Sequence, residues 1–98
     1  MAASLQNVFL VTVICESVLQ DRIVKLLKNA GASGYTITQA IGSGRHGSRM
    51  GDIAGFNTNI EIKVLTSEEI CDRLMAEMKP IQEKHALIAF RQPVEALL

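Results

Sequence analysis

The residues best suited to chemistry lie together in one short stretch, residues 42–49. This stretch holds three glycines, two serines and two arginines, and it directly follows a strand-like run over residues 35–41. Glycine allows backbone amides to turn toward a ligand, because no Cβ stands in the way. Arginine offers a charged, planar fork of donors that suits phosphate or carboxylate. The pattern predicts a loop that holds an anion.

The same stretch also has a simpler interpretation. Clusters of glycine and serine mark loops in general, so residues 42–49 are also compatible with a plain hairpin connection. A P-loop is excluded, since the GxxxxGK[ST] pattern does not occur and no helical pattern follows. The residues up to Asn57 have no clear periodicity. Connections of this length in a small domain are often functional.

The elements that must position this loop can be predicted from hydrophobic periodicity. Residues 8–15 are apolar and β-branched almost throughout, which is typical of a strand covered on both faces. Residues 58–65 alternate isoleucine and valine on one face with Glu61 and Lys63 on the other. Strands are expected over residues 8–15, 35–41, 58–65 and 85–91.

Two helical patterns alternate with these strands. Ser17 with Gln20, and Thr66 with Glu69, have the spacing of capping boxes and predict where the helices begin. An apolar stripe with helical spacing follows each of them. Three residues predict where elements end, namely Gly31 after the first helix, Pro80 near the end of the second helix and Pro93 after the last strand.

The order of these elements predicts the fold. A β-α-β-β-α-β order indicates an α+β protein with the ferredoxin-like arrangement, in which both helices cover one face of a four-stranded antiparallel sheet. The long loop joins strands 2 and 3, and all 98 residues are expected to form this single domain. The helices leave one sheet face uncovered, yet residues 8–15 are apolar on both sides. We therefore expect an oligomer whose sheets face inward, the alternative being a monomer with a tolerated apolar face.

Composition narrows the function classes further. Ten basic and ten acidic residues give a formal net charge of zero, which argues against broad attraction to nucleic acid or to an anionic membrane. No signal peptide is evident, and no apolar run approaches the roughly 20 residues of a membrane span. Cys15 and Cys71 have no metal-binding spacing. A cytoplasmic protein with buried, reduced thiols is expected, with membrane contact only through a partner.

Three pieces of the sequence, in this order, resemble the PII signalling superfamily. They are Gly-Tyr-Thr at residues 34–36, Gly-Ser-Gly-Arg at residues 42–45 and Ile-Glu-Ile at residues 60–62. The resemblance covers residues 8–92 and is strongest to the PII-like proteins of inorganic-carbon metabolism, the SbtB-like and carboxysome-associated types. It implies a homotrimer of ferredoxin-like subunits that binds adenine nucleotides in the clefts between neighbours.

The resemblance also implies roles for particular residues. Thr36 would lie beside the adenine or ribose, and the base pocket would be lined by Ile14, Glu61 and Lys63. The nucleotide would also meet the base of the so-called T-loop, which comprises Gly42, Ser43, Gly44, Arg45 and His46. Taken without the resemblance, Glu61 and Lys63 are equally compatible with a solvated strand face.

Ligands and partners follow from the same resemblance. The expected ligand is ADP or AMP, together with bicarbonate in some members. The T-loop of such proteins changes shape with the ligand and docks on a target. That target is expected to be a protein such as a bicarbonate transporter or a carboxysome-associated protein.

The sequence departs from PII proteins in the segment before the last strand. That segment has no glycine, so Lys84 is expected to replace the phosphate-binding lysine of the family, and His85 to add a donor. The C-terminal arginines that grip a terminal phosphate in PII proteins are not found, so di- or monophosphate is expected rather than triphosphate. The loop holds no tyrosine, so tyrosine nucleotidylation is not expected.

Rival classes of protein fit the sequence less well. Acylphosphatases share this size and fold, but they carry an arginine in a glycine-containing loop where this chain has Cys15, Glu16 and Ser17. RNA-recognition modules need aromatic residues on the central strands, and that pattern does not occur. No catalytic constellation stands out, so binding without catalysis is expected. The alternative function is a ferredoxin-like oligomeric module that binds another small anion or a protein, without nucleotide.

Overall fold

The arrangement of helices and strands follows the predicted order β-α-β-β-α-β. The computed structural model describes residues 4–41 and 59–98. Its elements are β1 (Gln6–Glu16), a single 3₁₀ turn η1 (Ser17–Leu19), α1 (Gln20–Ala30), β2 (Thr36–Ala40), β3 (Asn59–Thr66), α2 (Glu68–Gln82) and β4 (Leu87–Ala96).

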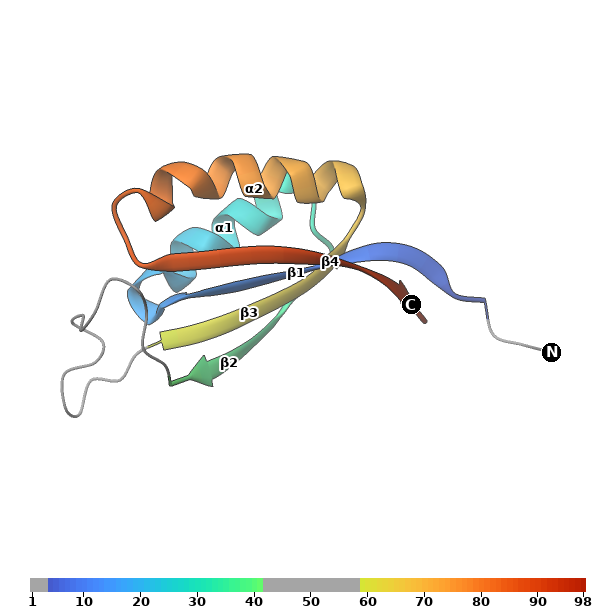
Figure 1. Ribbon diagram of the computed structural model, residues 1–98, viewed down its shortest axis with the longest axis horizontal. Coiled ribbons are helices and arrows are strands. Elements are labelled where there is room, and N and C mark those ends of the chain that lie inside the picture. Colours follow the sequence, from blue (N-terminus) through green and yellow to red (C-terminus); the bar gives the residue numbers. More distant parts are fainter. Residues whose placement is uncertain (1–3, 42–58) are drawn as a thin grey trace.

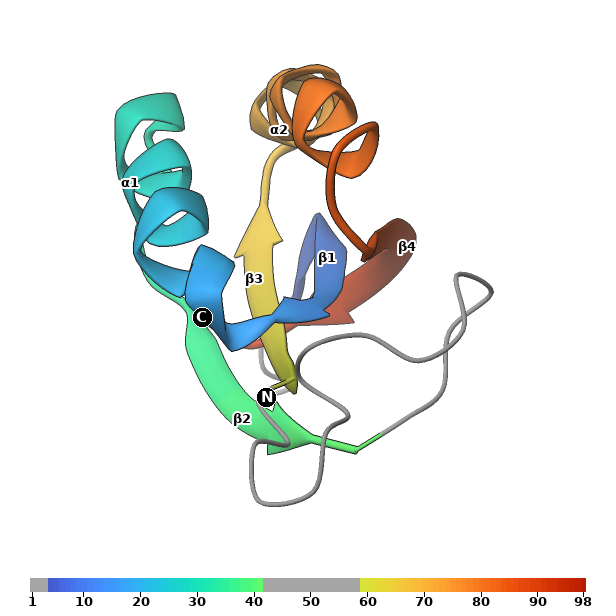
Figure 2. The same ribbon diagram turned by 90° about the vertical axis from the view of Figure 1, so that its left-hand side faces the viewer.

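The four strands form one antiparallel sheet with the order β2-β3-β1-β4. Both helices lie against the same face of this sheet, as the two views in Figures 1 and 2 show. No element within residues 4–41 and 59–98 covers the opposite face, which is called the open face below. The predicted ferredoxin-like fold is confirmed.

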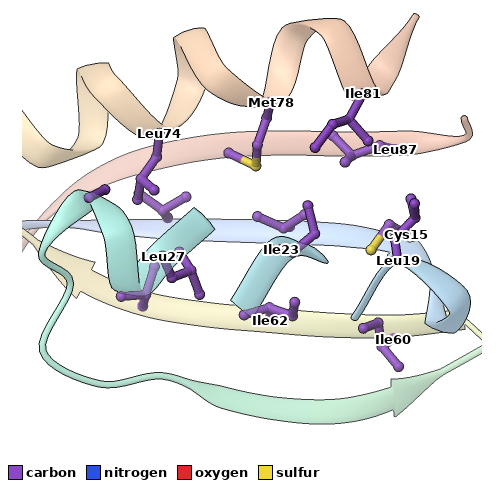
Figure 3. Packing of buried hydrophobic residues seen from close by; sticks show 14 of the residues in the cluster. Cys15, Leu19, Ile23, Leu27, Ile60, Ile62, Leu74, Met78, Ile81 and Leu87 are labelled. Atoms are coloured by element: carbon purple, nitrogen blue, oxygen red, sulfur yellow. The ribbon is translucent and has the colours of Figure 1, made fainter. Parts of the chain in front are cut away.

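The hydrophobic core lies between the sheet and the two helices (Figure 3). Strand β1 contributes every second residue to it, because successive side chains of a strand point to opposite faces. Val11 and Val13 are fully buried there, and Ile62 of β3 packs beside them with no exposure. The helices supply the other layer, with Ile23, Leu27, Leu74 and Met78 at 2% exposure or less.

Helix α1 begins later than its sequence suggested. The capping box predicted for Ser17 is wrong, because residues 17–19 form a 3₁₀ turn and no side chain caps it. The Gln20 N–H bonds to the Ser17 carbonyl instead. This tighter turn carries Leu19 into the core, where it is 4% exposed. Burial of one leucine, worth about 1.5–3 kcal/mol, outweighs a cap worth about 1 kcal/mol.

Helix α2 is capped one residue later than predicted. The hydroxyl of Ser67 accepts a hydrogen bond from the Ile70 N–H at 3.3 Å. Thr66 is instead the last residue of β3 and is 6% exposed, and its hydroxyl donates to the Ser67 carbonyl at 2.6 Å. The capping box of Thr66 with Glu69 is therefore wrong, because the strand retains Thr66.

Neither proline ends an element as predicted. Helix α2 continues through Pro80 to Gln82, because Ile81 is 2% exposed in the core and its burial holds the last turn. Pro80 removes one helical hydrogen bond and crowds the carbonyl four residues earlier, but only one turn from the end of the helix. Pro93 lies inside β4, which extends to Ala96. A proline is tolerated there because β4 is an edge strand, where one side of the backbone needs no partner.

A matched pair of glycine substitutions tests the end of α1. Gly31 has φ of 93°, and its N–H bonds to the Leu27 and Lys28 carbonyls, as predicted for a helix end. Gly31→Ala should lower the free energy of unfolding by about 1–2 kcal/mol, the cost of a left-handed residue with a Cβ. A Cβ at Gly34 meets nothing within 4 Å, so Gly34→Ala should be neutral or stabilising by up to about 1 kcal/mol.

Urea unfolding of both variants at one fixed protein concentration measures the difference. Equal destabilisation by the two substitutions would contradict the role given to Gly31.

Candidate functional site

The open face of the sheet carries four of the residues that the sequence marked for a ligand. Strand pairing places Ile14 opposite Glu61, and Thr36 opposite Lys63. Residues that pair across strands share a face, so all four side chains lie on the face away from the helices. The structure thus brings Ile14, Thr36, Glu61 and Lys63 together.

The open face has a polar half and an apolar half. The polar half lies over β2 and β3, where Thr36 and Thr38 flank Lys63 and Glu61. The apolar half lies over β1 and β4, where Ile88 pairs with Ile14. Phe90 extends this half, and the side chains of Ile88 and Phe90 are 50% and 44% exposed. A ligand with a polar part and a flat apolar part would meet both kinds of surface here.

Two opposite charges lie in the middle of the polar half. The Lys63 ammonium is 3.6 Å from the Glu61 carboxylate, with the two side chains 53% and 31% exposed. An ion pair this exposed adds only about 0–1 kcal/mol to stability. The fold therefore does not depend on these two charges, and either can turn to a ligand at little cost.

Lys84 and His85 lie in the turn between α2 and β4. The backbone N–H groups of both residues bond to the Ile81 carbonyl, at 3.1 and 2.9 Å, which anchors the turn to the end of α2. Lys84 is exposed and His85 is half-buried. The turn precedes Leu87, whose partner Cys15 is next to the last residue of β1. Lys84 and His85 are therefore at the end of the sheet where β1 finishes.

The predicted anion loop is attached to this same end. Ala40, the last residue of β2, pairs with Asn59, the first residue of β3. Gly42, Ser43, Gly44, Arg45 and His46 lie outside the described residues, as do all positions from 42 to 58. Their roles at a nucleotide therefore stay predictions.

Sequence reasoning missed two threonines of this face. Thr12 pairs with Lys63 on one side and Phe90 on the other, and it is 2% exposed. Thr38 pairs with Glu61. The sequence held a signal for Thr38, because Thr36 and Thr38 alternate with Ile37 and Gln39 and so share one face of a strand. The register that sets Thr12 beside Lys63 could not be read from the sequence.

Arg91 belongs to a separate cluster on the helix face. Its guanidinium donates to the Asp72 carboxylate at 2.6 Å and to the Cys71 thiol at 3.5 Å, and it lies 4.9 Å from the centre of the Phe9 ring. The hydrogen bonds to Cys71 and Asp72 hold the pKa of Arg91 above its ordinary value. These contacts join β4 to α2.

Within residues 4–41 and 59–98, no group of three or more His, Cys, Asp or Glu side chains could hold a metal ion. In that same part of the chain, no helix is long and apolar enough to cross a membrane.

Comparison with known families gives the class of protein. The model of the nitrogen regulatory protein P-II family matches residues 8–97. The chain therefore belongs to the P-II family, a class of signalling proteins. A search of curated protein sequences finds no match.

Solved structures give more specific relatives. A protein of Thermus thermophilus assigned as PII-like and signalling is 34% identical, with 96% of this chain and 93% of that chain covered and a TM-score of 0.81. CPII, a nitrogen regulatory PII-like protein from Thiomonas intermedia K12, is 26% identical, with 99% and 94% covered and a TM-score of 0.88. That CPII structure is bound to ADP, AMP and bicarbonate.

One more distant likeness concerns the fold alone. A DUF3240 family protein from Shewanella baltica OS155 is 16% identical, with 96% of this chain and 92% of that chain covered and a TM-score of 0.68.

The thiol next to the candidate site should make stability depend on pH. Burial raises the pKa of Cys15 from 9.0 to about 11, and the Glu16 carboxylate adds to the increase. The folded state therefore holds this proton more tightly than the unfolded state. Its contribution to stability is complete below pH 9 and is lost as the pH rises from 9 toward 11. At pH 10 the loss should be about 1 kcal/mol.

Unfolding of the wild type and of Cys15→Ala at about pH 7 and about pH 10 measures this contribution. The stability advantage of the wild type should shrink by that amount at the higher pH, because alanine has no proton to lose. An advantage that is the same at both pH values would show that the thiol is not desolvated.

Proposed function

We propose that this protein is a homotrimeric PII-like regulator that senses ADP or AMP, together with bicarbonate, at clefts between its subunits. It acts by binding and not by catalysis. Ligand binding controls the segment 42–58, which docks on a protein partner of inorganic-carbon metabolism. A bicarbonate transporter and a carboxysome-associated protein are partners of the expected kind.

One observation carries the ligand part of this proposal. CPII is bound to ADP, AMP and bicarbonate, and its structure superposes on 99% of this chain with a TM-score of 0.88. A second CPII structure, bound to ADP and bicarbonate, has a TM-score of 0.86. Ile14, Thr36, Glu61 and Lys63 share the open face, and Lys84 and His85 lie in the turn at the end of the sheet where β1 finishes, which supports a binding region on this side of the molecule.

The chemistry of that region suits a nucleoside phosphate. Ile14 and the aliphatic part of Lys63 give an adenine ring an apolar support, while Glu61 and Thr36 offer hydrogen-bonding groups to its edge and to the ribose. Arg45 and Lys84 supply the cations for the phosphates. Because only these two cations and His85 are assigned to the phosphates, a di- or monophosphate is the expected ligand.

The apolar half of the open face supports the trimer. Ile88 and Phe90 are large and half-exposed, and they alternate along β4 with residues that face the helices. A contiguous apolar patch of this kind marks an interaction surface. Packing of three copies with their open faces inward covers it, and leaves the polar half of each face at the boundary between copies.

Calorimetric titration with AMP, ADP, ATP and cyclic AMP, each with and without bicarbonate, tests the ligand assignment directly. Binding of ADP or AMP that bicarbonate strengthens is the expected result. Binding of phosphate alone, or of none of these ligands, would favour an oligomeric module that binds another anion or a protein.

Removing one arginine should weaken the nucleotide complex strongly. Arg45→Ala should cost about 1.5–3 kcal/mol, the range for a hydrogen bond to a charged group, which is a loss of about ten- to a hundredfold in affinity. Arg49→Ala is the matched control, since it removes the same charge from the same segment farther from Gly42, and it should cost less. An unchanged affinity of Arg45→Ala for ADP would move the phosphate site elsewhere.

The assembly has its own test. Light scattering at micromolar concentration should give about three times the 10.7 kDa mass of one chain. Phe90→Asp should reduce the mass toward that of one chain, because it buries a charge in the proposed contact. The single chain should stay folded, since Phe90 is 44% exposed within it. A wild type with the mass of one chain would refute the trimer and the clefts between subunits.

A further inference from the structure

A pocket lies between α2 and β4, away from the candidate site. It has a volume of about 190 Å³, and it is lined by Met75, Met78, Lys79, Gln82, Leu87 and Ala89. Leu87 and Ala89 pair with the core residues Cys15 and Val13, which places both on the helix face of the sheet. The pocket is therefore on the opposite side of the sheet from the ligand-binding residues proposed for the open face.

The space exists because one side chain of β4 is short. The row of β4 that faces the helices contains Leu87, Ala89 and Arg91, and Ala89 is its smallest member. Leu87 is 5% exposed in the core, and Arg91 turns to the Asp72 carboxylate at 2.6 Å. The gap over Ala89, between these two larger side chains, is left open.

Helix α2 supplies the other wall of the pocket. Its four lining residues have the spacing i, i+3, i+4 and i+7, so they lie on one face of the helix. Met78 is 2% exposed and belongs with Leu87 to the inner wall, and Figure 3 shows both side chains between α2 and β4. Methionine side chains adapt to irregular shapes. The inner part of the pocket therefore suits a flexible aliphatic group.

The rim of the pocket is polar and carries a positive charge. The Lys79 ammonium donates to the side-chain carbonyl of Gln82 at 3.3 Å, and the side-chain amide of Gln82 donates to the Leu87 carbonyl at 3.1 Å. These contacts hold the ammonium at the mouth of the pocket. An ammonium has further donors besides the one that meets Gln82, so Lys79 can also bind an anionic group there.

The size of the pocket and its single cation define a class of ligand. An engineered cavity of about 150 Å³ holds one benzene ring, so a pocket of about 190 Å³ takes a chain of about six to eight carbons. A carboxylate suits the rim better than a phosphate, because one ammonium balances one negative charge.

We propose that the pocket between α2 and β4 binds a medium-chain aliphatic carboxylate. The chain of the ligand lies over Ala89 and against Met75 and Met78, and its carboxylate meets the Lys79 ammonium. This site is additional to the nucleotide site and does not rest on the proposed function, since the two lie on opposite faces of the sheet.

Calorimetric titration with butanoate, hexanoate and octanoate tests the apolar part of the site. The affinity should rise about fourfold with each CH₂ group added between butanoate and hexanoate, because each added group is buried. The increase should level off at about eight carbons, where the pocket is full. An affinity that does not depend on chain length would overturn the proposal.

Two substitutions, each with a matched control, locate the bound ligand. Ala89→Leu should lower the affinity for hexanoate about tenfold or more, because the new side chain fills the space of the ligand chain. Ala76→Leu adds the same side chain on the exposed face of α2 and should leave the affinity unchanged. Lys79→Gln should lower the affinity for hexanoate about tenfold but leave that for hexanol, which has no charge, unchanged. Lys25→Gln, on the exposed face of α1, should change neither affinity.

The Lys79 test stands even where Ala89→Leu fails to fold, because Lys79 is exposed and its replacement leaves the core intact. Hexanoate that binds Lys79→Gln as tightly as the wild type would overturn the proposal, as would a wild type that does not bind hexanoate.

Titration of hexanoate in saturating ADP separates this site from the nucleotide site. The affinity for hexanoate should stay the same, and competition between the two ligands would place hexanoate in the nucleotide cleft and overturn the proposal. A protein that binds hexanoate in this pattern but binds no adenine nucleotide would support the pocket and refute the proposed function.

Discussion

Strand β1 is the element on which the rest of the structure depends, because it pairs with both β3 and β4 and is apolar on both faces. On one face Val11 and Val13 pack without exposure against the helices. On the other face Ile14 and Leu10 alternate with Thr12, and no helix within the described chain covers them. Burial of the first row drives folding. The second row leaves apolar surface that folding of one chain does not remove from water, so the same alternation that specifies the fold also favours assembly.

The order of the elements could be predicted from the sequence because each element buries one face, and burial leaves a period of two or of roughly 3.6 residues in the chain. The residues at which each element begins and ends could not be predicted in the same way. The cap moved from Thr66 to Ser67 and the first turn of α1 became 3₁₀, since at both places a side chain gained more from burial than from capping. Local rules predicted that Pro80 ends α2 and that Pro93 ends the last strand. The packing of Ile81 in the core and the edge position of β4 instead allow both elements to continue past their prolines.

The candidate site could be predicted only in part. Residues on one strand face, such as Glu61 and Lys63, were identified by alternation alone. That Ile14 lies beside Glu61 depends on the register between two strands far apart in the chain, which the sequence does not encode locally. Thr12 was missed for the same reason. The assignment of nucleotide roles came from likeness to a family, because an anion loop of glycine, serine and arginine has too many uses to name its ligand.

Pro93 has a consequence for solubility. A ten-residue edge strand with apolar side chains is a template on which other chains can add as strands, the first step toward fibrous aggregates. Pro93 has no N–H to offer at the outer edge of β4, and the side-chain amide of Gln82 donates to the Leu87 carbonyl near the start of the strand. The edge therefore cannot support the long, continuous ladder that an aggregate needs. The edge is thus protected against indefinite growth.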